Sequence, residues 1–160
     1  MFAFLLPVDL FKSASVAYIH YLGFMICFGA LIFERISLKP NPNKQEAISM
    51  VVADIIYGIA GIALLVSGIY RVIKFGQGAE FYTQNPIFWT KIVIFALVGS
   101  LSLYPTVTYV LWAIPLSKSM LPEVSENLVS RLRLIINIEL VGFASIPFFA
   151  TLMARGVGLP

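Results

Sequence analysis

Four ionisable side chains lie inside long apolar stretches of the sequence: His20, Asp54, Lys91 and Glu139. A charged group at membrane depth costs about 2.5–3.5 kcal/mol or more, so each of these residues is a candidate functional group that faces other helices. His20 is the only histidine, and a neutral imidazole is a common ligand of metals and of haem iron. We therefore predict that His20 is the axial ligand of a haem b or a related tetrapyrrole, with a hydrogen bond to a neighbouring helix as the alternative role.

Two basic residues are expected at nearly the same depth as His20. Counted at about 1.5 Å per residue, Lys91 lies about one and a half turns inside its apolar stretch and Arg71 lies at the rim on the same side. Two cations offset the cost of burying two carboxylates, so Arg71 and Lys91 are candidate partners of the propionates. For Lys91 the alternative is a side chain that extends to the membrane interface.

Asp54 and Glu139 enter the membrane from the opposite side, about two turns deep, close to Arg131 and Arg133. Isolated carboxylates at that depth are strongly unfavourable. We expect Asp54 or Glu139 to face the interior and to pair with a basic residue, Arg35, Arg131 or Arg133, which would orient the helices. The same two carboxylates favour a small transporter as an alternative function, although the sequence contains no inverted repeat.

The composition requires a membrane protein. Of the 160 residues 59% are hydrophobic and 12% are charged, against about 25% charged in an ordinary soluble domain, and the mean hydropathy is +0.91. The apolar stretches are long and continuous, which is typical of spanning helices and not of membrane β-barrels. The net charge of +3 comes from cations scattered at the ends of these stretches, so we expect no nucleic-acid partner.

The predicted fold is all-α, an integral membrane four-helix up-down bundle that forms one domain over residues 1–160. The four spans are expected at about 13–33, 47–73, 86–113 and 132–154, separated by segments rich in proline, asparagine and glycine. Asp9 is a candidate N-cap of the first span. Asn85 and Pro86 resemble the N-cap and first residue of the third span, which should end before Pro115.

Both termini then lie on one side, and four basic residues on that side against six on the other favour the two-loop side as cytoplasmic. Small residues on two spans, Gly23 and Cys27 on one and Gly58, Gly61 and Gly68 on the other, allow close helix packing or leave room for a flat cofactor. Tyr82, Trp89 and Trp112 are expected in interfacial aromatic belts. The sequence has no phosphate-binding glycine loop and no Ser-His-acid set, so hydrolytic chemistry is unsupported.

Several short patterns together resemble a known bacterial membrane family. They are His20, Asp54 with Gly58 and Gly61, Ser67-Gly68 with Arg71, Gly78 with Tyr82 and Asn85, Phe88-Trp89 with Lys91, Pro105, and the closing ATLMARG. Over nearly the whole chain the sequence resembles the four-helix family catalogued as domain of unknown function twenty-two fourteen, which implies the fold without an activity and a source in cyanobacteria or proteobacteria. It is more distantly similar to HemJ-type and CopD-like membrane proteins. The HemJ-type resemblance implies a tetrapyrrole at His20 and Lys91.

These observations lead to one functional expectation and one alternative. We expect a tetrapyrrole-binding protein with a redox role in a bacterial plasma or thylakoid membrane. Because one chain holds one histidine, a haem iron would be five-coordinate, take Lys91 or a methionine, or use His20 of a second protomer in a homodimer. The alternative is a non-enzymatic accessory or assembly subunit of a larger bioenergetic or photosynthetic membrane complex, and the sequence leaves open whether the chain is an enzyme.

Overall fold

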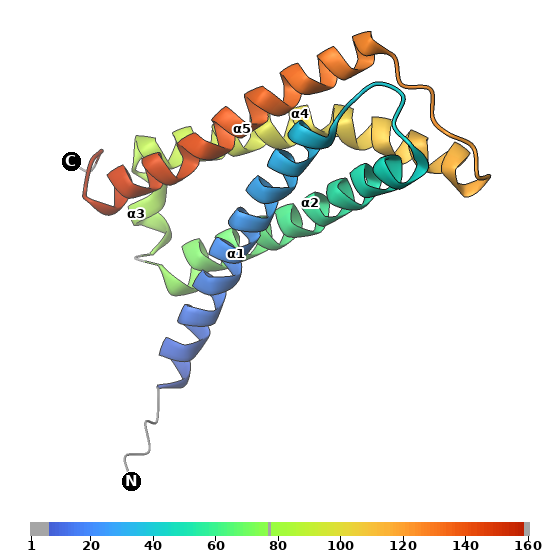
Figure 1. Ribbon diagram of the computed structural model, residues 1–160. Coiled ribbons are helices and arrows are strands. Elements are labelled where there is room, and N and C mark those ends of the chain that lie inside the picture. The colour runs from blue at the N-terminus through green and yellow to red at the C-terminus, as the bar shows by residue number, and fades with distance from the viewer. Residues whose placement is uncertain (1–6, 77, 159–160) are drawn as a thin grey trace.

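The computed structural model of the protein describes residues 7–76 and 78–158. Its elements are α1 (Val8–Ser37), α2 (Lys44–Tyr70), a π-helical turn (Arg71–Phe75), α3 (Ala79–Thr83), α4 (Pro86–Ser117) and α5 (Glu126–Ala154). Among these residues there is no β-strand, and four helices are long and apolar enough to cross a membrane: α1, α2 with its π-helical turn, α4 and α5. The expected all-α four-helix membrane bundle is confirmed (Figure 1).

Capping residues explain where two of the long helices begin. The Asn43 side chain accepts a hydrogen bond from the Glu46 backbone N–H, and the Glu46 carboxylate accepts one from the Asn43 N–H, both at 2.9 Å. This reciprocal capping box satisfies N–H groups that have no partner inside α2. At the start of α4 the Asn85 side chain accepts from Ile87 N at 2.9 Å and Pro86 is the first helical residue, as the sequence predicts.

Three predicted boundaries are wrong. Helix α1 begins at Val8 without a side-chain cap, so Asp9 lies in its first turn instead of capping it. Helix α4 continues through Pro115 to Ser117, because a proline within a membrane helix is tolerated when neighbouring groups satisfy the freed carbonyl. Helix α5 begins at Glu126, where the Ser125 hydroxyl accepts from Leu128 N at 3.2 Å, so its amphipathic first turns extend beyond the apolar stretch that starts near 132.

Contacts between the connecting segments define the two ends of the bundle. The α1–α2 and α4–α5 loops meet where Asn41 N donates to Val124 O at 3.4 Å. At the opposite end the Asn85 amide donates to Val157 O at 3.1 Å, which ties the start of α4 to the segment after α5. The chain therefore runs up and down between a loop end, which holds these two loops, and a terminal end (Figure 1).

The distribution of polar and apolar side chains is that of a protein solvated by lipid. Large apolar residues cover the outside, for example Ile62 (66% exposed) and Val141 (72%). The buried polar and charged residues are Glu34, Asp54, Ser67, Asn85, Ser102 and Glu139. Trp112 is also buried, 5.1 Å from the Tyr109 ring between centroids, so its expected place in an interfacial belt is wrong.

The glycines of α2 do not form the expected stripe. A Cβ at Gly58 or Gly61 would have no neighbour within 4 Å, and the buried face of α2 consists of Ala47, Met50, Ala53, Asp54, Tyr57, Ala60, Leu64 and Ser67. Because α2 is apolar on all sides, glycine spacing alone does not identify its packed face. In α1 the expectation holds, since a Cβ at Gly23 would lie 3.2 Å from the Ala60 carbonyl oxygen.

This close contact predicts the effect of a larger side chain at Gly23. Gly23→Val should destabilise the protein by about 1–3 kcal/mol, because the added atoms meet the rigid backbone of α2. Gly29→Val, on the same helix in open space, is the matched control and should change stability by less than about 0.5 kcal/mol. Thermal unfolding in detergent measures both, and equal losses would contradict the packing of α1 on α2.

The arrangement of the ends also predicts a labelling pattern. In a Cys27→Ser background, Lys39→Cys and Glu123→Cys should react with an impermeant maleimide from one side of the membrane, and Glu80→Cys from the other. Lys39, Glu123 and Glu80 are all exposed. Labelling of all three from one side would exclude the up-down topology.

Candidate functional site

His20 is held against α2 by its Nδ1 atom. That nitrogen lies 3.1 Å from the Leu64 carbonyl oxygen and 3.1 Å from the Ser67 hydroxyl oxygen. A carbonyl oxygen only accepts, so Nδ1 carries the proton. The Ser67 hydroxyl donates to Ala63 O at 2.6 Å and is therefore free to accept from His20. In this tautomer the lone pair lies on Nε2, which makes no hydrogen bond to a described residue.

The His20 imidazole fills the space between α1 and α2 that was predicted to hold a flat cofactor. A Cβ at Gly68 would lie 3.1 Å from His20 Cε1, so the ring packs directly on this glycine. One and two turns further along the seam, Gly23 lies against the α2 backbone and Cys27 donates its S–H to Tyr57 O at 3.6 Å. The expected slot for a flat cofactor between α1 and α2 is therefore absent, and any ligand of Nε2 must lie on the side of the ring away from α2.

Arg71 and Lys91 approach His20 from two other elements. Both cations are close enough to interact electrostatically with the imidazole and with each other. The Arg71 guanidinium carbon lies 5.0 Å from the centre of the Tyr21 ring, and Lys91 Nζ lies 5.7 Å from that of Phe88, both within the range of cation–π attraction. The structure thus brings together His20, Arg71 and Lys91 at the terminal end.

The π-helical turn that begins at Arg71 was not predicted. Such turns are rare and occur often at functional sites. Arg71 and Lys91 form no salt bridge within residues 7–76 and 78–158, where the one ion pair joins Lys39 and Glu46 at 2.8 Å. Two cations close together without an acidic partner form a surface suited to an anionic ligand.

Asp54 and Glu139 both face the interior, as expected. Asp54 is 7% exposed and its Oδ1 accepts from the Thr106 hydroxyl at 2.8 Å. Glu139 is 0% exposed, and neither of its carboxylate oxygens has a hydrogen-bond partner among the residues that the structure describes. The two carboxyl groups therefore lie in a desolvated environment with little polar compensation.

The expected ion pairs with Arg131 and Arg133 are wrong. Arg131 is exposed, and Arg133 donates from Nη2 to Leu38 O at 2.7 Å. Arg133 precedes Glu139 by six residues, which is about 9 Å along α5. Its hydrogen bond to Leu38 O places it at the end of α1. There it satisfies a carbonyl that lacks a partner within the helix.

Glu34 was predicted on the packed stripe of the first span but not as a site residue, and it is 1% exposed near the end of α1. It falls on the stripe that contains Gly23, Cys27 and Ala30, all of which are buried. That spacing is the signal that predicts its burial. Its position at the edge of the apolar stretch, next to Arg35, gives the opposite impression of an exposed interfacial residue.

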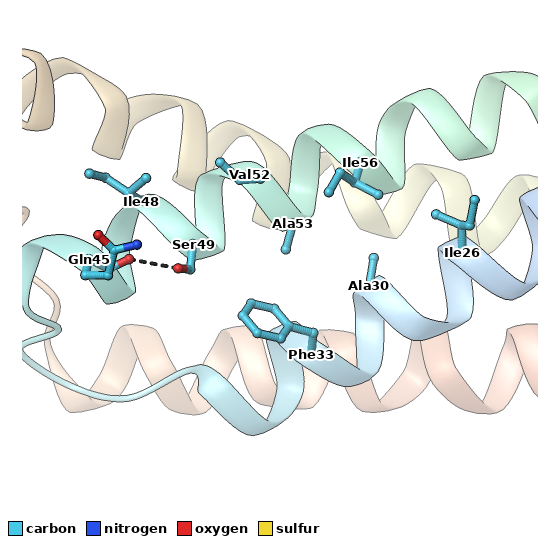
Figure 2. A pocket seen from close by; sticks show the side chains of 9 residues that line it. All are labelled: Ile26, Ala30, Phe33, Gln45, Ile48, Ser49, Val52, Ala53 and Ile56. Carbon is cyan, nitrogen blue, oxygen red and sulfur yellow. Dashed lines mark hydrogen bonds between the residues drawn. The ribbon is translucent and has the colours of Figure 1, made fainter.

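Two apolar grooves follow the lipid-facing side of the α1–α2 seam. The first has a volume of about 530 Å³ and is lined by the nine residues of Figure 2, Ile26, Ala30, Phe33, Gln45, Ile48, Ser49, Val52, Ala53 and Ile56. The second, of about 230 Å³, includes Ser67 and is smaller than the roughly 300–1,000 Å³ of typical small-molecule sites. No ionisable side chain lines the first groove, and Tyr70 is the one ionisable residue among those that line the second.

The chain was compared with known families and proteins. No curated protein and no solved structure matches it, so the similarity to HemJ-type and CopD-like proteins receives no support. One family, described as "Predicted membrane protein (DUF2214)", matches residues 12–158. That range includes all four membrane helices except the first residues of α1. The chain therefore belongs to the DUF2214 family of membrane proteins.

Proposed function

We propose that this membrane protein binds a haem b or a related tetrapyrrole at its terminal end and has a redox role. The observation that carries the proposal is the tautomer of His20: Nδ1–H donates a hydrogen bond to the Leu64 carbonyl oxygen, and the Nε2 lone pair is available. Histidine ligands of metals commonly donate a hydrogen bond from the N–H of their other ring nitrogen to a carbonyl oxygen in this way. When bound, haem iron supplies one-electron oxidation and reduction.

The neighbouring residues have separate roles in this proposal. Arg71 and Lys91 bind the propionates, because charge-assisted hydrogen bonds to carboxylates are stronger than neutral ones. Ser67 and Gly68 position the imidazole, the serine by accepting from Nδ1 and the glycine by leaving room for the ring. His20, Arg71 and Lys91 would hold a tetrapyrrole on the side of His20 that faces away from α2, since the seam itself is filled.

This location bears on the oligomeric state. His20 is partly exposed to the outside of the bundle, so a second copy of the chain can supply another ligand across a symmetric dimer. A homodimer with two His20 ligands and one tetrapyrrole is the arrangement that this exposure favours. The family resemblance supports a bacterial plasma or thylakoid membrane as its location.

Absorption spectra test the proposal. Wild-type protein purified in detergent from cells supplied with a haem precursor should give a haem band in the reduced-minus-oxidised spectrum. His20→Ala should lose the band, and added imidazole should restore part of it, since free imidazole replaces a missing ligand but not a missing structural hydrogen bond. If wild type shows no tetrapyrrole band, the haem proposal fails and the accessory-subunit alternative is favoured.

The two cations have their own test with a matched control. Arg71→Gln and Lys91→Gln should each weaken haem binding about tenfold or more, because each removes a charged hydrogen bond of about 1.5–3 kcal/mol. Lys74→Gln removes an exposed cation from the same π-helical turn and should have little effect. Haem titration of the apoprotein measures all three, and equal affinities would exclude propionate binding by Arg71 and Lys91.

A further inference from the structure

Three carboxyl groups from three helices are buried in the interior toward the loop end. Glu34 comes from α1, Asp54 from α2 and Glu139 from α5, and their exposed fractions are 1%, 7% and 0%. Glu34 is close enough to interact electrostatically with both other carboxyl groups, and Glu139 with Asp54. We call Glu34, Asp54 and Glu139 the carboxyl cluster.

A buried tyrosine without a partner faces the same cluster. Tyr109 on α4 is 0% exposed, and its hydroxyl group has no hydrogen-bond partner among the described residues. It is close enough to interact electrostatically with all three carboxyl groups. Buried tyrosine hydroxyl groups normally have a hydrogen-bond partner. The Tyr109 O–H and the unpartnered oxygens of Glu34 and Glu139 therefore indicate that a proton, an ion or a small molecule binds at this site.

No basic side chain neutralises the cluster. The salt bridge found in residues 7–76 and 78–158 lies outside it. On α1 and α5, Arg35 donates to the Asn137 side chain at 2.6 Å and Arg133 donates from Nη2 to Leu38 O, while the buried Arg133 Nε has no partner among the described residues. Neither arginine forms an ion pair with the cluster in the described part of the chain.

The other titratable groups around the cluster are one thiol and two phenols, none of which can carry a positive charge. They are Cys27 of α1, Tyr57 of α2 and Tyr109 of α4, and they interact electrostatically with one another or with the carboxyl groups. Three negative charges without a counter-ion are not stable in a desolvated bundle. The cluster must therefore bind a cation.

The geometry favours the smallest cation. The described residues include no group of three or more His, Cys, Asp or Glu side chains placed to hold one metal ion. A proton needs only one oxygen atom. We propose that the carboxyl cluster is a proton-binding site whose protons exchange with water at the loop end.

The depths of the three residues limit the path of proton transfer. Glu34 lies three residues before the end of α1, whereas Asp54 follows the start of α2 by ten residues and Glu139 follows the start of α5 by thirteen. Asp54 therefore lies roughly 15 Å from the start of its helix. Counted from the contact between Arg133 and Leu38 O, Glu139 lies about 9 Å and Glu34 about 6 Å further into the bundle, so these two carboxyl groups are at similar depth. Glu34 accepts a proton from a hydronium ion at the loop end, which leaves water, and it ionises again when it passes the proton to the carboxylate of Glu139 or Asp54.

Infrared spectroscopy of the whole protein tests this proposal. Wild-type protein in lipid nanodiscs at neutral pH should show the C=O stretching band of a protonated carboxyl group. The band should shift when H₂O is replaced by D₂O and should disappear as the pH is raised. Glu139→Gln and Glu34→Gln should each remove part of it, while Glu123→Gln, at an exposed loop position, should leave it unchanged.

A chemical test covers the case in which a variant fails to fold. Dicyclohexylcarbodiimide, an apolar reagent that modifies protonated carboxyl groups, should label Glu34 or Glu139 in the wild-type protein but not Glu123, as read by peptide mass spectrometry. A carboxyl band that responds to neither D₂O nor pH would show a closed structural group and overturn the proposal. The absence of both the band and the label at neutral pH would overturn it as well.

Discussion

The close packing of α1 on α2 is the constraint on which both polar regions depend. At its centre Gly23 brings the two backbones together, with its Cα hydrogen facing the Ala60 carbonyl. Toward the terminal end this contact sets His20 against Leu64 and Ser67. Toward the loop end it sets Glu34 beside Asp54. Since helices are stiff and packed interiors are dense, a shift along this seam would displace both groups of residues at once.

The sequence predicts the fold well because a bilayer restricts the choices. Every backbone polar group must be satisfied inside lipid, so long apolar stretches can only form helices that span. The cap at Asn85 was also predictable, because an asparagine before a proline marks a helix start. The missed boundaries lie where helices continue past the apolar core, as at Glu126 and Ser117, since hydropathy marks the membrane and not the end of the helix.

The candidate sites were only partly predictable. Depth counting correctly grouped His20 with Arg71 and Lys91, because helix rise is regular. It did not predict the partners of Asp54 and Glu139, because an arginine can reach either a carboxylate or the carbonyl at a helix end, and Arg133 takes the carbonyl of Leu38. The outward position of Gly58 was also unpredictable, since a helix that is apolar on all sides carries no signal for its packed face.

The ionisable groups of the two regions are of opposite type, basic at the terminal end and acidic toward the loop end, and their separation along α1 is fixed. Glu34 follows His20 by fourteen residues on one straight helix, which is about 21 Å. At an effective dielectric constant near 20, two unit charges at that distance interact by roughly 0.8 kcal/mol. An ionised carboxyl cluster stabilises the cations at the terminal end, and each proton that binds to the cluster reduces that stabilisation. In the reverse direction, an anion bound at the terminal end favours proton uptake by the cluster. The common seam makes this coupling a property of the fold, because neither region can move relative to the other without breaking the packing at Gly23.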